Sequence, residues 1–355
     1  MDVSEEGAIG YSFFCTVTDL FISIPFCKTI FWLKEKRERE TTMPDSKILF
    51  IIKLDLLATI YSFMEEIPAN KPQKGKVWKL LLKIFISGIC LWYVSGKIDF
   101  EKAGEALKNA RWIFLVPALI AFIISKIISS IRLNIYFKDI RVLLSEKQNL
   151  RLYWLGMFYN LFLPGSIGGD AYKVILLTKR SGVPYKKTTA AVVLDRISGL
   201  LGLGLLLAVY SVVVVRNNIY TTAIISGALL AIFFLWFLIK SYFPDFLKSF
   251  LPTLVLGLFV QVCQVICAYF IMAALGIPVS NSAYIFIFLV SSVAAVLPLT
   301  IGGLGIREMV FLEGSAYFGL IEENSVVISI LFYLITLFTS VWGLIYIFRD
   351  PFKKN

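Results

Sequence analysis

The chain has 355 residues, of which 58% are hydrophobic and only 17% carry a charged side chain. Soluble domains average about 45–50% apolar and about 25% charged residues, so this composition argues against a soluble protein and indicates an integral membrane protein. The sequence contains no histidine, which excludes imidazole general bases and imidazole metal ligands, and we expect no cofactor and no metal.

The formal net charge is +11, a value that is also typical of nucleic-acid-binding proteins. Here the basic residues lie in short segments between apolar runs, where they act as orientation signals, so we expect no nucleic-acid partner. Five cysteines lie inside apolar segments without Cys-x-x-Cys spacing, and we interpret them as packing residues rather than as disulfides or a metal site. They are Cys15, Cys27, Cys90, Cys263 and Cys267.

Residues 1–75 differ from the rest of the chain and are predicted to form an amino-terminal extension. Residues 8–32 are long enough to span a bilayer, although Asp19 lies among them. Residues 47–63 are apolar with interspersed charges and are predicted to form an interfacial helix. The acidic start of the chain lacks the positive region of a signal peptide, so none is expected.

A regular membrane pattern occupies residues 76–350, followed by a short basic tail at 351–355. Apolar runs close to the ~20 residues that cross a bilayer predict about six full spans. The predicted spans cover residues 80–96, 112–131, 197–215, 221–239, 251–275 and 325–347. The expected fold class is therefore an all-α polytopic membrane protein.

Two further apolar segments share a repeated break. "FLPGSIGGDAYK" at 162–173 and "VLPLTIGGLGIRE" at 296–308 both contain Pro-x-Ser/Thr-Ile-Gly-Gly. In each copy a cation follows nine residues after the proline, as Lys173 and as Arg307. Proline and glycine interrupt helices, so each copy predicts two half-helices separated by a break.

The break at Pro164 lies about a dozen residues after Arg151, roughly 18 Å of helix, which reaches about halfway through a ~30 Å apolar core. Basic residues follow it again, so residues 152–181 are predicted to be a re-entrant hairpin. Residues 283–320 are predicted to be a second re-entrant hairpin that enters from the opposite face. Two such hairpins together indicate an inverted repeat. The alternative is that both copies are kinks in complete helices.

Loop charge predicts the orientation of the chain in a cell membrane. Basic residues before the first predicted span, around both ends of the first hairpin and in the tail place those segments and the carboxyl terminus in the cytoplasm. These residues include Lys71, Lys74, Lys76, Lys79, Arg132, Lys138, Arg141, Lys147, Arg151, Lys179, Arg180, Lys186, Lys187, Arg349, Lys353 and Lys354. The acidic segment 321–324 is expected to be external.

The two breaks are the candidate binding site. Free N–H groups and the helix dipole make the start of each second half-helix an anion site, and Lys173 and Arg307 add positive charge there. Small residues at the break allow a ligand close to the backbone. We therefore predict that this site binds a phosphate-bearing head group. The small residues are Gly168, Gly169, Gly302 and Gly303.

Four more charged residues lie at predicted membrane depth. Asp170 is interpreted first as an N-cap, with contact to Lys173 or to a substrate left open. Asp195 and Arg196 are neighbours in sequence and should face different elements, and Arg307 and Glu308 follow the same logic. The carboxylates either belong to a substrate site or form a structural ion-pair network.

Three motifs in order, "YNLFLPGSIGGDAYKV", "VVLDRISGLLGL" and "LPLTIGGLGIREMVF", resemble the lysylphosphatidylglycerol synthase transmembrane-region family of flippase-like membrane proteins. The resemblance covers roughly residues 76–350. At Lys173 the family often has arginine, so two-point phosphate binding would be lost there. The family pattern falls on Asn160, Pro164, Gly165, Gly168, Gly169, Asp170, Asp195, Arg196, Gly199, Pro298, Gly302, Gly303, Gly305, Arg307 and Glu308.

The resemblance implies a lipid translocator, either a flippase or a scramblase, for an anionic phospholipid or a polyprenyl-phosphate-linked glycolipid. In the aminoacylating members, chemistry resides in a separate soluble domain after the membrane region, and the residues after Phe348 are too few for one. We therefore expect no enzymatic activity. The alternative is a membrane subunit or lipid-handling partner of a glycosyl- or aminoacyl-transferase. Membrane lipids are the expected ligands in either case.

Overall fold

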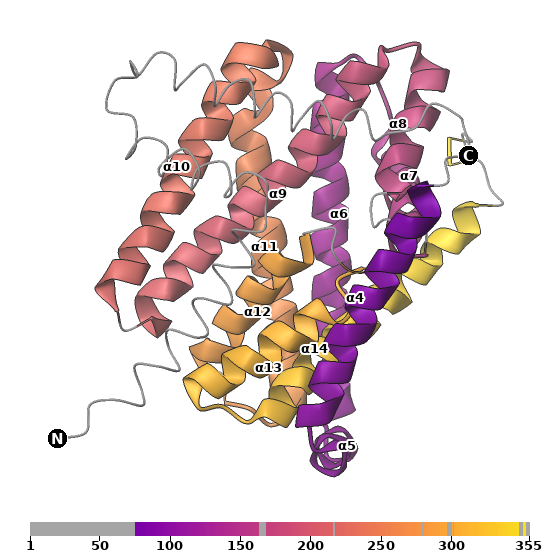
Figure 1. Cartoon of the computed structure of the whole chain (residues 1–355). Coiled ribbons are helices and arrows are strands. Elements are labelled where there is room, and N and C mark those ends of the chain that lie inside the picture. The colour runs from indigo at the N-terminus through magenta and orange to yellow at the C-terminus, as the bar shows by residue number, and fades with distance from the viewer. Residues whose placement is uncertain are drawn as a thin grey trace. The chain divides into compact units, whose positions relative to one another are not determined.

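A computed structural model describes residues 75–162, 168–215, 217–278, 280–296, 300, 302–347 and 351–352. These residues belong to the second of two units, Lys74–Asn355, and contain helices but no strand. Figure 1 follows the helices from α4 to α14. The span predicted at 8–32 and the interfacial helix predicted at 47–63 lie outside the described residues.

The helices follow one another with short connections. In chain order they are α4 (Gly75–Lys97), α5 (Phe100–Lys108), η1 (Trp112–Phe114), α6 (Leu115–Asp139), α7 (Glu146–Phe162), α8 (Gly168–Ser181), α9 (Tyr185–Val214), α10 (Asn218–Tyr242), η2 (Pro244–Ser249), α11 (Phe250–Ala274), α12 (Ser282–Val296), α13 (Ile306–Phe318), α14 (Glu322–Val341) and η3 (Trp342–Tyr346).

The predicted fold class, an all-α multi-pass membrane protein, is confirmed. Five helical stretches among the described residues are long and apolar enough to cross a membrane, and each contains one predicted span to within one residue at the span's end. They are Trp112–Asp139, Tyr185–Val214, Asn218–Tyr242, Pro244–Ala274 and Glu322–Tyr346. The sixth predicted span, 80–96, lies in α4, whose part Ile84–Lys97 is an apolar helix shorter than these five.

Each repeated break separates two short helices that pack against each other, so neither copy is a kink in one continuous helix. α7 ends at Phe162 and α8 begins at Gly168, and the two helices pack together. Gln148 Nε2 donates to the Phe352 carbonyl oxygen at 2.8 Å, and the Arg180 guanidinium lies 4.2 Å from the centre of the Phe352 ring. The start of α7 and the end of α8 therefore lie at the same end of the bundle.

The second hairpin, α12 and α13, closes on itself in the same way. The Phe286 and Phe318 rings, near its entry and its exit, are 5.9 Å apart and meet edge to face. A Cβ on Gly314 would lie 2.9 Å from Ile287, so the two helices approach closely along their length. The pair α7 and α8 is called hairpin 1 from here on, and the pair α12 and α13 is called hairpin 2.

The two hairpins enter from opposite ends of an antiparallel helix pair, α6 and α11. Arg111 N–H, just before α6, donates to the Ala274 carbonyl at the end of α11, at 2.8 Å. Tyr136, near the end of α6, and Thr253, near the start of α11, share a 2.7 Å hydrogen bond. Hairpin 1 follows α6 and hairpin 2 follows α11, so their entries lie at opposite ends (Figure 1).

This arrangement repeats one unit twice. α6 to α9 and α11 to α14 each consist of a long helix, a hairpin and a closing helix. The first helix of each hairpin packs against the closing helix of the other unit, α7 on α14 and α12 on α9. The order and the cross-packing are those of the predicted inverted repeat.

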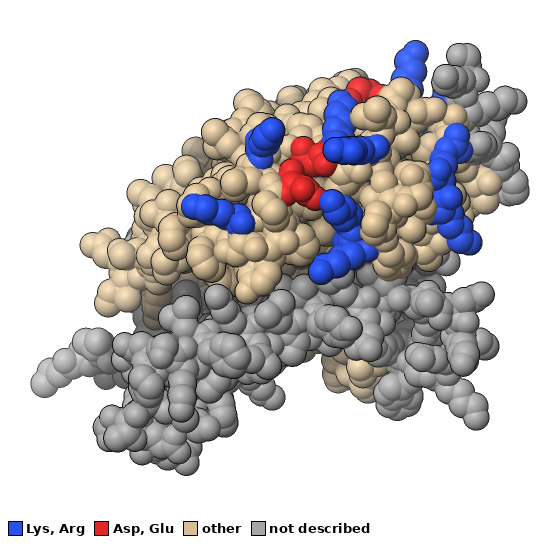
Figure 2. All heavy atoms as spheres, turned by 90° about the horizontal axis from the view of Figure 1, so that it is seen from above, with Lys and Arg blue, Asp and Glu red and all other residues tan. Residues whose placement is uncertain are grey.

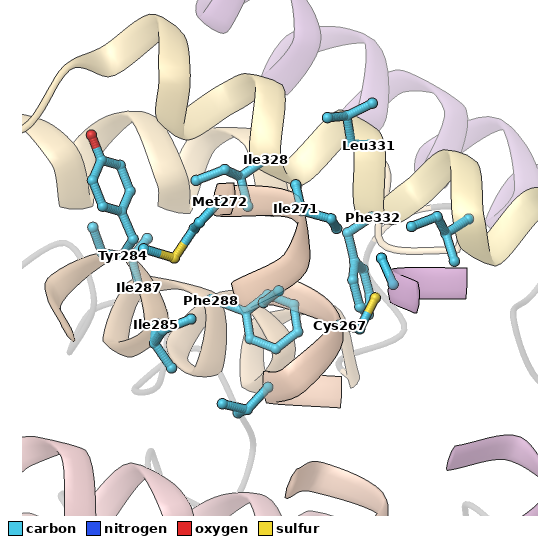
Figure 3. Packing of buried hydrophobic residues seen from close by; sticks show 14 of the residues in the cluster. Cys267, Ile271, Met272, Tyr284, Ile285, Ile287, Phe288, Ile328, Leu331 and Phe332 are labelled. Atoms are coloured by element: carbon cyan, nitrogen blue, oxygen red, sulfur yellow. The ribbon is translucent and has the colours of Figure 1, made fainter. Parts of the chain in front are cut away.

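The largest buried hydrophobic cluster of the described residues lies mainly between α11, α12, α14 and the first half of α6, and Figure 3 shows part of it. In this cluster the ring centre of Phe332 of α14 lies 4.8 Å from that of Phe288 of α12 and 5.5 Å from that of Phe122 of α6. Both pairs are edge to face, the preferred geometry of buried aromatic side chains. The cluster therefore joins hairpin 2 to the long helices of both units.

α9 and α11 cross at glycines, which lets their backbones touch. A Cβ on Gly202 would lie 2.6 Å from the carbonyl carbon of Gly257, and one on Gly257 would lie 2.7 Å from the Ser198 carbonyl oxygen. Small residues at such crossings are characteristic of helix packing in membranes, where close backbone approach supplies the contact energy. At this crossing the repeat α6 to α9 contacts the repeat α11 to α14 through backbone, without intervening side chains.

We predict that Gly202→Ala lowers the free energy of unfolding by about 1–3 kcal/mol, because the new methyl group must separate α9 from α11. Gly204→Ala, two residues along the same helix, is the matched control, since nothing lies within 4 Å of a Cβ there. It should be neutral or stabilising by up to about 1 kcal/mol. Unfolding in detergent micelles measures both variants, and equal effects would contradict the close crossing.

Candidate functional site

Residues that border the two breaks lie next to each other. Leu161, in the last turn of α7, packs against Gly302, where a Cβ would lie 2.8 Å from the Leu161 Cδ1 atom. Gly302 has φ +62° and Gly303 has φ +85°, left-handed values that L side chains rarely adopt. The predicted glycines thus permit both the backbone turn of hairpin 2 and the approach of hairpin 1.

The start of α8, the second helix of hairpin 1, is capped by a side chain of α7, the first helix. Asn160 Oδ1 accepts a hydrogen bond from the Gly169 N–H at 2.9 Å, which satisfies one free donor at the start of α8. A Cβ on Gly169 would overlap the backbone carbonyl of Gly156, so this position requires glycine. Gly168 is partly exposed beside it. Pro164 and Gly165 lie outside the described residues.

Asp170 lies within the first turn of α8, and the observed cap is Asn160, so the interpretation of Asp170 as the N-cap is corrected. Its carboxylate accepts hydrogen bonds from Arg196 Nε of α9, from Lys173 Nζ at 3.2 Å and from Asn160 Nδ2 at 3.4 Å. Lys173 is 4% exposed, and its ammonium lies 4.6 Å from the centre of the Tyr153 ring. The Lys173 charge is therefore neutralised within the protein.

Asp195 and Arg196 face different elements, as their adjacency predicted. Arg196 pairs with Asp170 of α8, whereas Asp195 accepts from Arg132 Nε of α6 at 2.7 Å. Arg132 was expected in a loop after the span 112–131, but α6 continues to Asp139 and buries Arg132 to 5% exposure. The Arg132 guanidinium lies against Gly199, which leaves room for it. This ion pair joins α6 to α9.

Glu308 is the acceptor at the corresponding place in hairpin 2. Its carboxylate accepts from the Gly305 N–H at 2.7 Å and from the Ser329 hydroxyl of α14 at 2.9 Å, and the residue is 2% exposed. It therefore caps the start of α13 and fastens that start to α14. The structural interpretation accounts for both of its contacts.

Arg307 differs from the other cations of the site. Its guanidinium lies 4.9 Å from the centre of the Phe332 ring. Its buried Nη1 atom has no hydrogen-bond partner, which is also true of Arg132 Nη1, so the difference lies in the carboxylates. Within the described ranges no carboxylate lies at ion-pair distance from Arg307. Joint binding of one phosphate by Lys173 and Arg307 stays a prediction. In the structure Lys173 is paired with Asp170, whereas Arg307 has no ion-pair partner among the described residues.

Lys126 is a charged residue of the site that sequence analysis did not single out. It lies near the middle of the span Trp112–Asp139, partly exposed, with its ammonium 4.4 Å from the centre of the Phe122 ring. The signal was present in the sequence, because a lysine in the middle of an apolar run is a functional candidate by default. The described part of the chain contains no cluster of His, Cys, Asp and Glu that could hold a metal.

Comparison with known proteins agrees with this architecture. The chain matches the family described as "Lysylphosphatidylglycerol synthase TM region" over residues 80–253 and 245–343. The chain belongs to this family. The match includes both hairpins and all the site residues named above.

A curated relative of this chain is a UPF0104 membrane protein from Pyrococcus horikoshii. It is 28% identical to the chain over 120 residues, which make up 33% of this chain and 35% of the relative. The alignment thus spans about a third of either protein. Both descriptions name membrane proteins, so the chain is a multi-pass integral membrane protein by family as well as by fold.

We predict that the Arg132–Asp195 pair is required for stability. Arg132→Met should lower the free energy of unfolding by about 3–5 kcal/mol, because it leaves a buried carboxylate without its cation. The matched control is Lys187→Met, since Lys187 Nζ lies 2.6 Å from Asp245 Oδ2 but both side chains are about half exposed. That variant should cost at most about 1 kcal/mol.

Unfolding in detergent micelles measures both variants, together with the double variant Arg132→Met/Asp195→Leu. The double variant should be less destabilised than Arg132→Met alone, because no unpaired charge remains. A loss for Arg132→Met no larger than that for Lys187→Met would contradict the pairing.

Proposed function

We propose that this protein translocates an anionic lipid across the membrane, as a flippase or scramblase, and is not itself an enzyme. The substrate class is a phospholipid or a polyprenyl-phosphate-linked glycolipid. The observation that carries the proposal is the close approach of two broken hairpins from opposite ends of the bundle, at Leu161 and Gly302. Arg307 follows Gly302 in hairpin 2, and among the described residues no carboxylate lies at ion-pair distance from it.

Broken helices at matching positions of an inverted repeat are where transporters hold their substrates. Each break here supplies a helix start, and the charge of Arg307 is available there for a phosphate. The acyl or isoprenoid chains would stay in the bilayer while the head group passes between the hairpin tips. Movement of one repeat unit against the other would open the site to each side in turn.

One end of the bundle carries many basic residues. Figure 2 shows lysine and arginine gathered on the end where hairpin 1 enters, with few acidic residues among them. Exposed basic residues at that end are Lys138, Arg141, Lys147, Lys179, Arg180, Lys186, Lys187, Lys240 and Lys248. By the positive-inside rule we infer that this end, with the carboxyl terminus, faces the cytoplasm of a cell membrane.

The proposal predicts that the purified protein moves a fluorescent acidic phospholipid between the leaflets of liposomes. Arg307→Gln should slow this movement by about tenfold or more, since hydrogen bonds to charged groups are among the stronger ones. Its unfolding temperature should stay close to that of the wild type, because no ion partner is lost. Leaflet exchange is followed by quenching of the lipid fluorophore with an impermeant reductant.

Lys240→Gln is the control, because Lys240 lies over the Trp236 ring on the bundle surface. It should leave the rate unchanged. Loss of transport in Arg307→Gln that merely follows a loss of stability would contradict the site. Formation of an aminoacylated or glycosylated lipid by the protein alone would overturn the proposal in favour of a transferase.

A further inference from the structure

The cations at membrane depth fall into two groups by their partners. Arg132 pairs with Asp195, and Lys173 and Arg196 share Asp170. Lys126 and Arg307 have neither a carboxylate nor another hydrogen-bond acceptor for their side chains among the described residues. An unpaired cation inside a membrane is costly, so these two need an explanation that the paired ones do not.

Both unpaired cations lie on one aromatic wall. The Lys126 ammonium lies over Phe122 and the Arg307 guanidinium over Phe332, at 4.4 and 4.9 Å from the ring centres. The two rings touch edge to face, with centres 5.5 Å apart. The wall thus brings together a cation from α6 and one from hairpin 2, although they are far apart in sequence.

The two cations lie near enough for their charges to act on each other. Contact with an aromatic face offsets part of the cost of each charge, but it neither neutralises them nor relieves their repulsion. The nearest carboxylate in sequence, Glu308, is directed at Gly305 N–H and Ser329. Arg307 Nη1 also keeps a buried donor without an acceptor. An oxyanion between the Lys126 and Arg307 side chains would offset both positive charges and accept a hydrogen bond from Arg307 Nη1.

We propose that Lys126 and Arg307 together bind one phosphate group, with the Phe122 and Phe332 rings forming the apolar wall beside it. The ligand class is a phosphate ester on an apolar chain, as in an acidic lipid. Arginine supplies two parallel donors and lysine a point charge, a combination suited to a phosphate. This deepens the proposed function and rests on it, because it adds Lys126 of α6 to Arg307 as the second cation that contacts the phosphate. Lys173 then keeps its structural role beside Asp170 at the start of α8.

Both residues are partly exposed, so a ligand can reach them. Lys173, by contrast, is almost fully buried under Tyr153 and beside Asp170. A site made of Lys126 and Arg307 needs no ion pair to open before the ligand binds. The site formed by α6 and hairpin 2 would also couple head-group binding to the position of that hairpin relative to the long helices.

The test is equilibrium binding of short-chain phosphatidic acid to the purified full chain in detergent, with short-chain diacylglycerol as the uncharged comparison. Lys126→Gln and Arg307→Gln should each weaken phosphatidic acid binding by about 10-fold or more and leave diacylglycerol binding unchanged. Lys126→Arg should retain binding. Lys240→Gln is the matched control, since Lys240 lies over Trp236 with the same four-residue spacing as Lys126 over Phe122.

A second measurement uses the wild-type protein, so that it does not depend on the folding of a variant. Phosphatidic acid should protect the Lys126 amine, but not the Lys240 amine, from acylation, as measured by peptide mass spectrometry. Inorganic phosphate in excess should fail to displace the lipid if the ligand is a lipid phosphate, and displacement would assign the site to the free ion.

Unchanged phosphatidic acid binding in folded Lys126→Gln, or equal acylation of Lys126 with and without the lipid, would overturn the assignment. Because binding is measured without transport, the two proposals fail separately. Binding that depends on Lys126 in a protein that moves no lipid would contradict only the proposed function. Lipid transport by the protein, together with phosphatidic acid binding that is unchanged in Lys126→Gln, would contradict only this inference.

Discussion

The structure depends on one constraint, that a helix starting inside a membrane bundle must find acceptors for its first N–H groups. Hairpin 1 meets it with Asn160, which accepts from Gly169, and hairpin 2 meets it with Glu308, which accepts from Gly305. Both acceptors are side chains of the hairpins themselves, and each satisfies one of the free N–H groups at its helix start. The cost of an irregular backbone at this depth is thereby offset.

The buried charges follow from the same constraint. Asp170 and its partners fix the start of α8 against α9, and Arg132 with Asp195 fixes α9 against α6. The unit from α6 to α9 therefore contains two groups of ion pairs, Arg132 with Asp195 and Asp170 with Lys173 and Arg196. Hairpin 2 is held by the hydrogen bond from Ser329 to Glu308 and by aromatic packing, and Arg307 has no carboxylate at ion-pair distance among the described residues. The two units share an architecture but differ in how their charges are used.

The sequence predicted the helix breaks because proline and glycine act locally, and loop charge was enough to place the two hairpins on opposite sides. The separate partners of Asp195 and Arg196 followed from helix geometry alone. Arg132 was assigned to a loop because the apolar run ends before it, while α6 continues two turns further. The segment between the predicted spans 80–96 and 112–131 was given no helix, but it contains α5, which Asp99 caps by accepting from the N–H groups of Glu101 and Lys102. Which cation lacks a partner is a tertiary property, and no local pattern reveals it.

The central claim is that each hairpin enters and leaves on one side of the membrane, and that the two hairpins use opposite sides. Labelling of single cysteines with an impermeant maleimide in sealed vesicles tests it most directly. On a background without native cysteines, the exposed positions Lys147 and Lys186 flank hairpin 1, and Ser280 and Ile321 flank hairpin 2. We expect the first two to react from one side of the membrane and the last two from the other. Reaction of Lys147→Cys and Lys186→Cys from opposite sides would contradict the account, because residues 152–181 would then cross the membrane.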